Sequence, residues 1–139
     1  NVIGHAASLG VEEPLIAAIA PLELVNPEMP STLDAAILSK MSQRKQFGRA
    51  VIEGPLGMDN AESASAARVK GVNSPVPGHA DIYVYPDLES ASIAAQFISW
   101  PGRCELAGIA AGCDFPVIIR SPLEARSAWL MNILLGILP

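Results

Sequence analysis

Four polar side chains suited to act on an anionic substrate come directly after segments that have the pattern of β-strands. Asp59 and Asp87 each follow one such segment, and Arg120 with Ser121 follows another. A carboxylate can accept a proton, while a guanidinium and a hydroxyl can hold the oxygens of a phosphate. Because the carboxyl ends of parallel strands meet at one crevice of an open α/β sheet, we expect these side chains to lie near one another. The residues alone therefore predict an α/β domain with an anion-binding crevice.

The stretch 51–61, VIEGPLGMDNA, is the one around which we expect the rest of the chain to be organised. Its apolar start predicts a strand. Gly54-Pro55 predicts the turn that ends this strand, since glycine permits unusual backbone angles and proline fixes its own φ. Asp59 is expected to cap the N-terminus of a helix over residues 61–69. A plain connecting loop with an ordinary helix cap has the same signature, and this alternative stays open.

Strands and helices alternate along the remainder of the chain. Apolar runs predict strands at 15–20, 50–53, 80–85 and 115–119, and Pro86 ends the third of them. Helical patterns predict helices at 1–9, from a cap at Ser31 or Thr32 to Gly48, and at 61–69, 88–99 and 123–138, whereas 105–111 is ambiguous. This alternation favours a single α/β domain over residues 1–139, with one mostly parallel sheet and helices on its faces.

The composition argues against several classes of partner. A net charge of −5 and a pI near 4.9 leave no electrostatic footprint for nucleic acid or for an anionic membrane. Cys104 and Cys113 are the only cysteines and form no CxxC pair, so we expect neither a disulfide framework nor a zinc site. No signal-peptide pattern is present, and the apolar tail at 129–138 is too short to span a bilayer. Cytoplasm is the expected compartment.

The first residues read as the end of an amphipathic helix that Gly10 terminates. A mature N-terminus rarely begins inside such a helix, so we expect a segment of a longer protein or a natural truncation. The two histidines, His5 and His79, are expected at the surface rather than in a catalytic role.

Five stretches, in order and with sensible spacing, resemble the phosphate acetyl/butyryl transferase family, closest to its butyryltransferase branch. They are VNPEMPSTLDAAILSKM (25–41), VIEGPLGMDNAES (51–63), KGVNSPVPGHADIYVYPDLE (70–89), LAGIAAGCDFPVII (106–119) and Ser121 just after. The resemblance covers nearly the whole chain and corresponds to the second domain plus the last strand and helix of a protein about twice this length. It implies a three-layer domain of the isocitrate/isopropylmalate dehydrogenase type, with the active site in the cleft between two domains and no first domain in this chain.

The resemblance implies acyl transfer between coenzyme A and inorganic phosphate, giving an acyl phosphate. Acyl-CoA and phosphate would be the partners, coenzyme A being a substrate and no cofactor or metal being permanently bound. Homodimers would form largely through this domain. Ser121 and Asp59 would be catalytic, and the residues implied to bind substrate, coenzyme A or phosphate are Gly54, Pro55, Ser74, Pro86, Asp87, Arg120 and Arg126.

Two departures from the family pattern fall where ligands are expected. Pro122 follows Ser121 where the family has an arginine, so a phosphate-binding guanidinium is missing from its usual place. Arg120 stands one residue early, and Arg126 in the first turn of the final helix is the other candidate to supply the charge. The run PDLESAS at 86–92 also differs from the family's PDLExGN.

These departures leave a second reading from a different class, a catalytically weak or inactive domain that binds coenzyme A or dimerises. In a third interpretation the chain is a decarboxylating dehydrogenase-like relative, but the sequence lacks the cationic and carboxylate cluster that a metal–hydroxyacid site needs.

The final helix bears on assembly, because residues 129–138 are apolar nearly all the way round, with only Asn132 and Gly136 interrupting. Such a helix must be covered on every side, which predicts a homodimer or a larger assembly.

Overall fold

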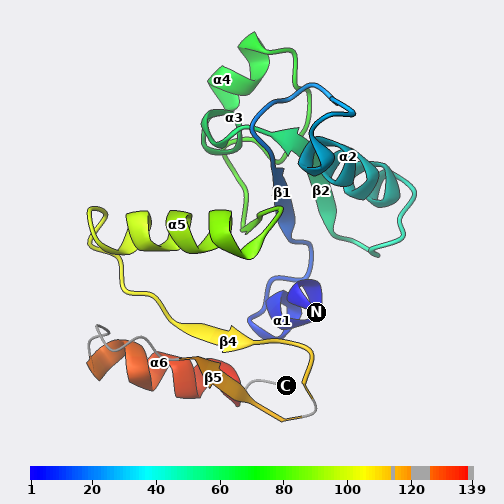
Figure 1. Ribbon diagram of the computed structural model, residues 1–139. Helices are drawn as coiled ribbons and strands as arrows, with labels where there is room; N and C mark the ends of the chain where they lie inside the picture. The colour runs from blue at the N-terminus through cyan, green and yellow to red at the C-terminus, as the bar shows by residue number, and fades with distance from the viewer. Residues whose placement is uncertain (114, 120–125, 138–139) are drawn as a thin grey trace. The chain divides into compact units, whose positions relative to one another are not determined.

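The computed structural model describes residues 1–113, 115–119 and 126–137 of the chain. These residues group into two compact units, one over Glu12–Ala91 and one formed by Asn1–Val11 and Ser92–Pro139. The described helices are α1 (Val2–Ser8), α2 (Pro30–Gln43), α3 (Met58–Glu62), α4 (Ala64–Val69), α5 (Leu88–Ser99) and α6 (Arg126–Gly136) (Figure 1). The described strands are β1 (Leu15–Ile19), β2 (Val51–Leu56), β3 (Ile82–Val84), β4 (Gly108–Ala110) and β5 (Val117–Ile119). No helix among them is long and apolar enough to cross a membrane.

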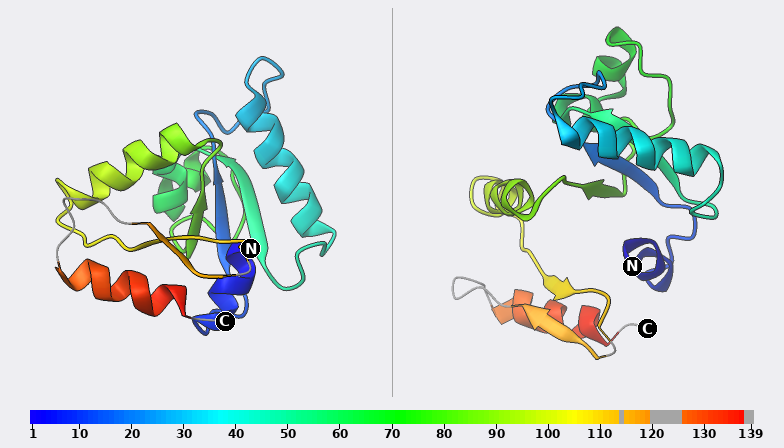
Figure 2. Two further views of the ribbon diagram at one scale, coloured as in Figure 1. Left: turned by 60° about the horizontal axis from the view of Figure 1, so that its bottom comes forward. Right: turned by 45° about the vertical axis from the view of Figure 1, so that its right-hand side comes forward.

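The unit Glu12–Ala91 is built on a three-stranded parallel sheet in the order β2-β1-β3. The central strand, β1, pairs in parallel with both neighbours, and its residues from Ile16 onward are buried. Helix α2 packs along β2 (Figure 2). The predicted α/β fold is confirmed, as are parallel strands within 15–20, 50–53 and 80–85.

Strand β2 does not stop where the sequence predicts a turn. It continues through Gly54 and Pro55 to Leu56, across a cis Gly54–Pro55 peptide bond. The register shifts at this point, so that Gly54 and Pro55 together oppose Ala18 of β1. Such a bulge leaves one residue out of the ladder, which accommodates a proline that has no N–H to donate. The predicted turn at Gly54-Pro55 is therefore wrong, because the bulge keeps the strand going.

Gly54 is required by the close approach of three chain segments. A Cβ atom on Gly54 would lie 2.7 Å from the Cβ of Ala18, 2.8 Å from the carbonyl oxygen of Ala18 and 3.2 Å from the Cβ of Ala35 in α2. The carbonyl oxygen belongs to the central strand and cannot swing aside. The glycine thus serves packing between β1, β2 and α2, in addition to any role in binding.

Helix α2 begins and ends earlier than its sequence pattern predicts. Its N-cap is Met29 rather than Ser31 or Thr32, and Pro30 is the first helical residue, a position that needs no N–H. Thr32 is buried instead, and its hydroxyl accepts a hydrogen bond from the N–H of Asn26 at 2.9 Å. At the other end Lys45, with φ +59°, takes the left-handed place expected of Gly48.

The outer edge of β2 is closed by side chains instead of a further strand. The buried Ser42 hydroxyl of α2 donates to the carbonyl of Ala50 at 3.1 Å and accepts from the N–H of Ile52 at 2.9 Å. The N–H of Gly54 donates to the Glu53 carboxylate at 3.1 Å. A helix and a strand are thereby joined by hydrogen bonds that replace part of a β-ladder.

Three helix boundaries fall where the sequence predicts them. Helix α1 ends with Gly10 at φ +88°, the N–H of Gly10 bonding to the Ala7 carbonyl and that of Val11 to the Ala6 carbonyl. This is the paired hydrogen-bond pattern of a glycine-terminated helix. Helix α5 has the predicted bounds, Leu88–Ser99.

In the other unit β4 and β5 form an antiparallel pair. The prediction that 115–119 joins the parallel sheet is wrong, since β5 pairs with β4 in a second sheet. The ambiguous segment 105–111 supplies β4. Because the connection between β4 and β5 is short, their antiparallel pairing costs little chain entropy.

Helix α6 packs its small and polar side chains against this pair of strands. Ala128 and Asn132, one turn apart, are buried. The Asn132 side chain accepts from the Gly108 N–H in β4 and donates to the Ile119 carbonyl in β5. Large apolar side chains in and directly after the helix are about half exposed or more, namely Trp129, Leu130, Met131, Leu134 and Ile137. The described residues thus leave apolar surface on α6 uncovered.

Candidate functional site

The carboxyl ends of β1, β2 and β3 lie in the unit Glu12–Ala91, and the polar residues that follow them form the candidate site. Glu23 comes from the loop after β1, Asp59 follows β2, and Asp87 follows β3. The Tyr85 hydroxyl lies 3.5 Å from the Met58 sulfur, which brings the ends of β2 and β3 together. This edge matches the place where an open parallel sheet binds its ligands.

Asp59 lies in the first turn of α3 and does not cap it. The N-cap is Gly57, whose carbonyl accepts hydrogen bonds from the N–H groups of Asn60 at 3.0 Å and Ala61 at 2.9 Å. The predicted cap at Asp59 is therefore wrong by two residues, because the helix begins as soon as β2 ends. A negative charge in the first turn still suits the positive end of the helix.

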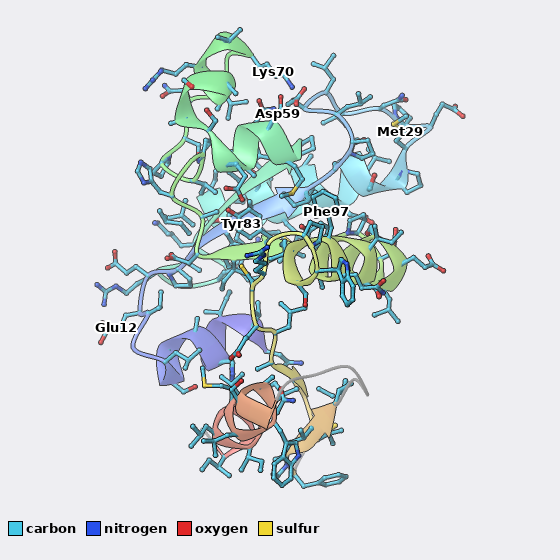
Figure 3. The ribbon with its side chains drawn as sticks, turned by 90° about the vertical axis from the view of Figure 1, so that its left-hand side faces the viewer. Glu12, Met29, Asp59, Lys70, Tyr83 and Phe97 are labelled. Atoms are coloured by element: carbon cyan, nitrogen blue, oxygen red, sulfur yellow. The ribbon has the colours of Figure 1, made fainter. Side chains whose placement is uncertain are left out.

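The predicted helix over 61–69 is divided at Ser63. This residue is extended, with φ −132°, and its hydroxyl oxygen accepts a hydrogen bond from the Ala66 N–H at 3.3 Å. Serine is a favoured N-cap, so it starts α4 where α3 ends. The division lets the chain turn, and α4 ends at Lys70 beside Asp59 (Figure 3).

Lys70 carries the main electrostatic contacts of the site. Its Nζ lies 2.7 Å from Glu23 Oε1 and 2.9 Å from Asp59 Oδ2. The Lys70 ammonium holds the pKa values of the Glu23 and Asp59 carboxyl groups below their usual range, and the two carboxylates, Glu23 first, raise the pKa of Lys70. All three groups are therefore charged near neutral pH.

Asn60 completes this cluster from within the protein. It is fully buried, and its side-chain N–H donates to Glu23 Oε1. Its Oδ1 has no hydrogen-bond partner among the described residues. Sequence reasoning missed Glu23, Asn60 and Lys70; Glu23 and Lys70 are 47 residues apart, so no local spacing links them.

Asp87 caps the helix that follows β3. Its Oδ1 accepts a hydrogen bond from the Ser90 N–H at 2.7 Å, and this contact lowers the pKa of the Asp87 carboxyl. Pro86 precedes it and is exposed. Beside them burial raises the pKa of Tyr83 to about 12, with a hydrogen bond to Glu62 adding to the shift, so the phenol stays neutral.

Gly54, Pro55 and Ser74 are the remaining predicted site residues whose positions the structure describes in full. Gly54 and Pro55 are buried inside β2. Ser74 lines a cavity of about 250 Å³ beside the first half of β2, together with Lys45 and Glu53. Arg120 and Ser121 lie outside the described residues, as does the side chain of Arg126. The proximity of Ser121 to Asp59 thus stays a prediction.

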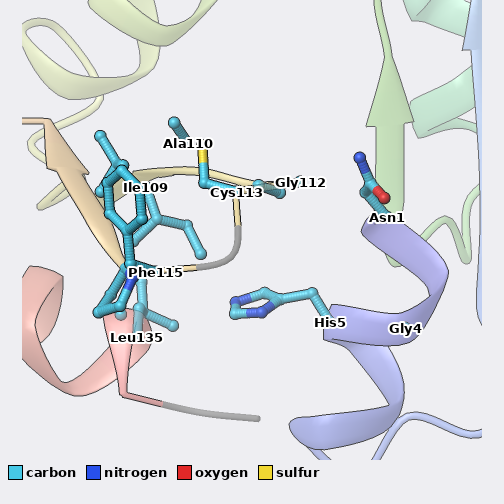
Figure 4. A pocket seen from close by; sticks show the side chains of 13 residues that line it. Asn1, Gly4, His5, Ile109, Ala110, Gly112, Cys113, Phe115 and Leu135 are labelled. Atoms are coloured by element: carbon cyan, nitrogen blue, oxygen red, sulfur yellow. The ribbon is translucent and has the colours of Figure 1, made fainter.

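A second cavity lies within the unit formed by Asn1–Val11 and Ser92–Pro139. It measures about 570 Å³, and the His5 imidazole of α1 points into it opposite Phe115 and Leu135 (Figure 4). Cys113 also lines it, and both cysteines of the chain are free and exposed. Within the described residues no group of His, Cys, Asp and Glu is placed to hold a metal ion.

Comparison with known proteins places this geometry among phosphate acyltransferases. The family described as Phosphate acetyl/butaryl transferase matches residues 1–134. A phosphate acetyltransferase of Rhizobium meliloti is 41% identical over 125 residues, 90% of this chain and 40% of that protein. A phosphate butyryltransferase of Clostridium acetobutylicum is 38% identical over 138 residues, 99% of this chain and 46% of that protein.

The same similarity holds in three dimensions. A crystal structure of a branched-chain phosphotransacylase from Enterococcus faecalis V583 superposes with a TM-score of 0.85 at 27% identity, covering 98% of this chain and 49% of that one. The chain thus spans less than half the length of each of these three proteins.

Proposed function

The chain belongs to the phosphate acetyl/butyryl transferase family, and on that premise we propose that it forms part of a phosphate acyltransferase. The reaction would move a short acyl group between coenzyme A and inorganic phosphate. The observation that carries the proposal is the family match over residues 1–134, which includes the parallel-sheet unit and most of the final helix α6. Acyl-CoA and phosphate would be substrates, with coenzyme A released rather than retained.

The candidate residues would have different roles in the proposed acyl transfer. Transfer passes through an anionic tetrahedral centre that carries both the phosphate and the thioester sulfur, so it needs fixed donors and a proton acceptor. Ser121 would stabilise the developing charge, and Arg120 or Arg126 would hold the phosphate. Asp59, ionised at the carboxyl edge of the sheet, would accept the thiol proton of coenzyme A.

A specific observation favours a second function for the same chain. Pro122 stands where the family has its phosphate-binding arginine, and the run PDLESAS at 86–92 differs from the family's PDLExGN. Both departures would weaken turnover while leaving the fold intact. A domain that binds coenzyme A without fast transfer is therefore the alternative.

Phosphate-dependent release of coenzyme A from butyryl-CoA and acetyl-CoA tests the proposed function. The chain would be assayed alone and with the N-terminal half of the Clostridium acetobutylicum relative added. We expect turnover, and we expect Ser121→Ala to lower kcat by about 100- to 1,000-fold, the usual cost of losing a donor to a developing oxyanion.

Ser127→Ala is the matched control, because among the described residues the Ser127 hydroxyl bonds to the exposed Glu105 carboxylate at 2.6 Å. It should leave kcat unchanged. Tight binding of coenzyme A by calorimetry without any turnover would instead establish the second function.

We further propose that the chain forms homodimers, in which α6 contributes apolar area near the contact. Trp129, Leu130 and Leu134 are each about half exposed, and a specific interface buries about 1,200 Å² or more in total. Sedimentation at micromolar concentration should show a dimer that Leu134→Glu disrupts and Gln46→Glu, on an exposed loop, does not. A monomer in the unmodified chain would contradict the proposal.

The cytoplasm is the compartment we propose. The free, exposed thiols of Cys104 and Cys113 suit a reducing environment. Recovery of the protein from cells with oxidised cysteines in an extracytoplasmic fraction would refute this.

A further inference from the structure

Three chain segments that are distant in sequence meet at the Lys70 ammonium. Lys70 ends α4, Glu23 lies in the loop after β1, and Asp59 lies in the first turn of α3. The ammonium lies 2.7 Å from Glu23 Oε1 and 2.9 Å from Asp59 Oδ2. The two carboxylates differ in exposure, since the Glu23 side chain is 21% exposed and that of Asp59 is 59% exposed. The Lys70 ammonium therefore bonds to the exposed Asp59 carboxylate and to the more shielded Glu23 carboxylate.

The shielded partner, Glu23, is itself held from two sides. Its Oε1 accepts from the Lys70 ammonium and from the side-chain N–H of the fully buried Asn60. Asn60 is the neighbour of Asp59 on α3, so the same short helix carries both the anchor contact and the exposed carboxylate. Asp59 is therefore held by a lysine whose own position is fixed by Glu23.

Gly57 supplies the room for this arrangement. A Cβ atom there would lie 2.8 Å from Asp59 Oδ1 and 2.9 Å from Glu23 Oε1. The backbone of Gly57 has φ −68° and ψ 155°, which any residue adopts, so the glycine is not needed for its conformational freedom. The absence of a side chain is instead what lets both carboxylates approach Lys70.

We propose that Lys70 is a positioning residue for the acyl-transfer reaction, in which it fixes the Asp59 carboxylate at the carboxyl edge of the sheet with Glu23 as its anchor. This role rests on the proposed function as a phosphate acyltransferase. An ion pair as exposed as Lys70–Asp59 contributes little to stability, so stability alone does not account for the cluster. A carboxylate held in one rotamer is ready for proton transfer, whereas a free one samples several.

Nuclear magnetic resonance of the side chains tests the positioning without any need for turnover. In the unmodified chain, scalar couplings should show one χ1 rotamer for Asp59, and Lys70→Met should average it. Removal of the ammonium should also raise the Asp59 and Glu23 pKa values toward the usual range, because Lys70 is the largest cause of both lowered values. Lys70→Arg should restore the single rotamer.

Steady-state kinetics test the consequence for the reaction. Lys70→Met should lower kcat about 10- to 100-fold while KM for acyl-CoA changes little, as expected when a reacting group is misplaced by about an ångström. Gly57→Ala should lower kcat too, because it displaces the carboxylates and leaves every charge in place. Lys40→Met is the control, since the Lys40 ammonium is exposed and bonds to Gln43.

The outcomes separate the positioning role from the proposed function. An active unmodified protein whose kcat and Asp59 rotamer are both unchanged by Lys70→Met would overturn the positioning role alone. An inactive unmodified protein in which Lys70→Met still frees the Asp59 rotamer would refute the acyltransferase function and support the positioning of Asp59.

Discussion

A Gly54→Ala variant is expected to lose about 3 kcal/mol of unfolding free energy, near the upper end of what overpacking a tight core costs. The added methyl group would lie 2.7 Å from the Ala18 Cβ and 2.8 Å from the Ala18 carbonyl oxygen. Both atoms belong to the central strand β1, and Ala35 of α2 closes the remaining side at 3.2 Å. The strain therefore has to move a strand or a helix.

Urea unfolding followed by circular dichroism measures this loss. Gly4→Ala in α1 is the matched control, because a Cβ there meets no heavy atom within 4 Å, and alanine in a helix should stabilise by about 0.5 to 1 kcal/mol. Adding Ala18→Gly to Gly54→Ala should restore part of the loss by removing one of the two clashes. Equal stability of Gly54→Ala and Gly4→Ala would show that the packing at Gly54 is looser than described.

Ser42→Ala should lower the unfolding free energy by about 2 to 3 kcal/mol, because it leaves two buried backbone groups without their hydrogen-bond partner. The Ser42 hydroxyl bonds both the Ala50 carbonyl and the Ile52 N–H, and the residue is only 5% exposed. Urea unfolding and faster hydrogen exchange at the Ile52 amide would report the loss. Ser31→Ala in the same helix should change stability by less than about 0.5 kcal/mol, as for other substitutions away from such contacts. A similar small change at Ser42 would mean that water replaces the hydroxyl.

Local sequence patterns predicted the helices and strands whose bounds depend on residues close by in the sequence. The apolar run at 15–20 identifies β1, and Pro86-Asp87 marks the start of α5, because Asp87 caps that helix through its own side chain. The course of β2 could not be predicted in this way. Whether Gly54-Pro55 ends a strand or forms a bulge depends on the partner strand β1, which a local pattern does not contain.

The candidate site also combines features that local sequence predicts with features that only the tertiary fold creates. The carboxyl ends of the strands were predicted to carry polar residues, and Asp59 and Asp87 do lie at the ends of β2 and β3. The Lys70 contact to Glu23 spans 47 residues, and the tertiary fold alone creates it. Helix α6 shows the same limit, since the local pattern does not reveal that Asn132 is buried, like Ala128, and hydrogen-bonds to β4 and β5.

The side-chain closure of the β2 edge has a consequence for the protein when it is concentrated. A strand of another molecule that arrives beside β2 finds the N–H groups of Ile52 and Gly54 already bonded to the Ser42 hydroxyl and the Glu53 carboxylate. It can use these two donors only by displacing the Ser42 hydroxyl or the Glu53 carboxylate. Intermolecular strand addition, the first step toward amyloid-type fibres, is thereby disfavoured along this stretch of the folded protein.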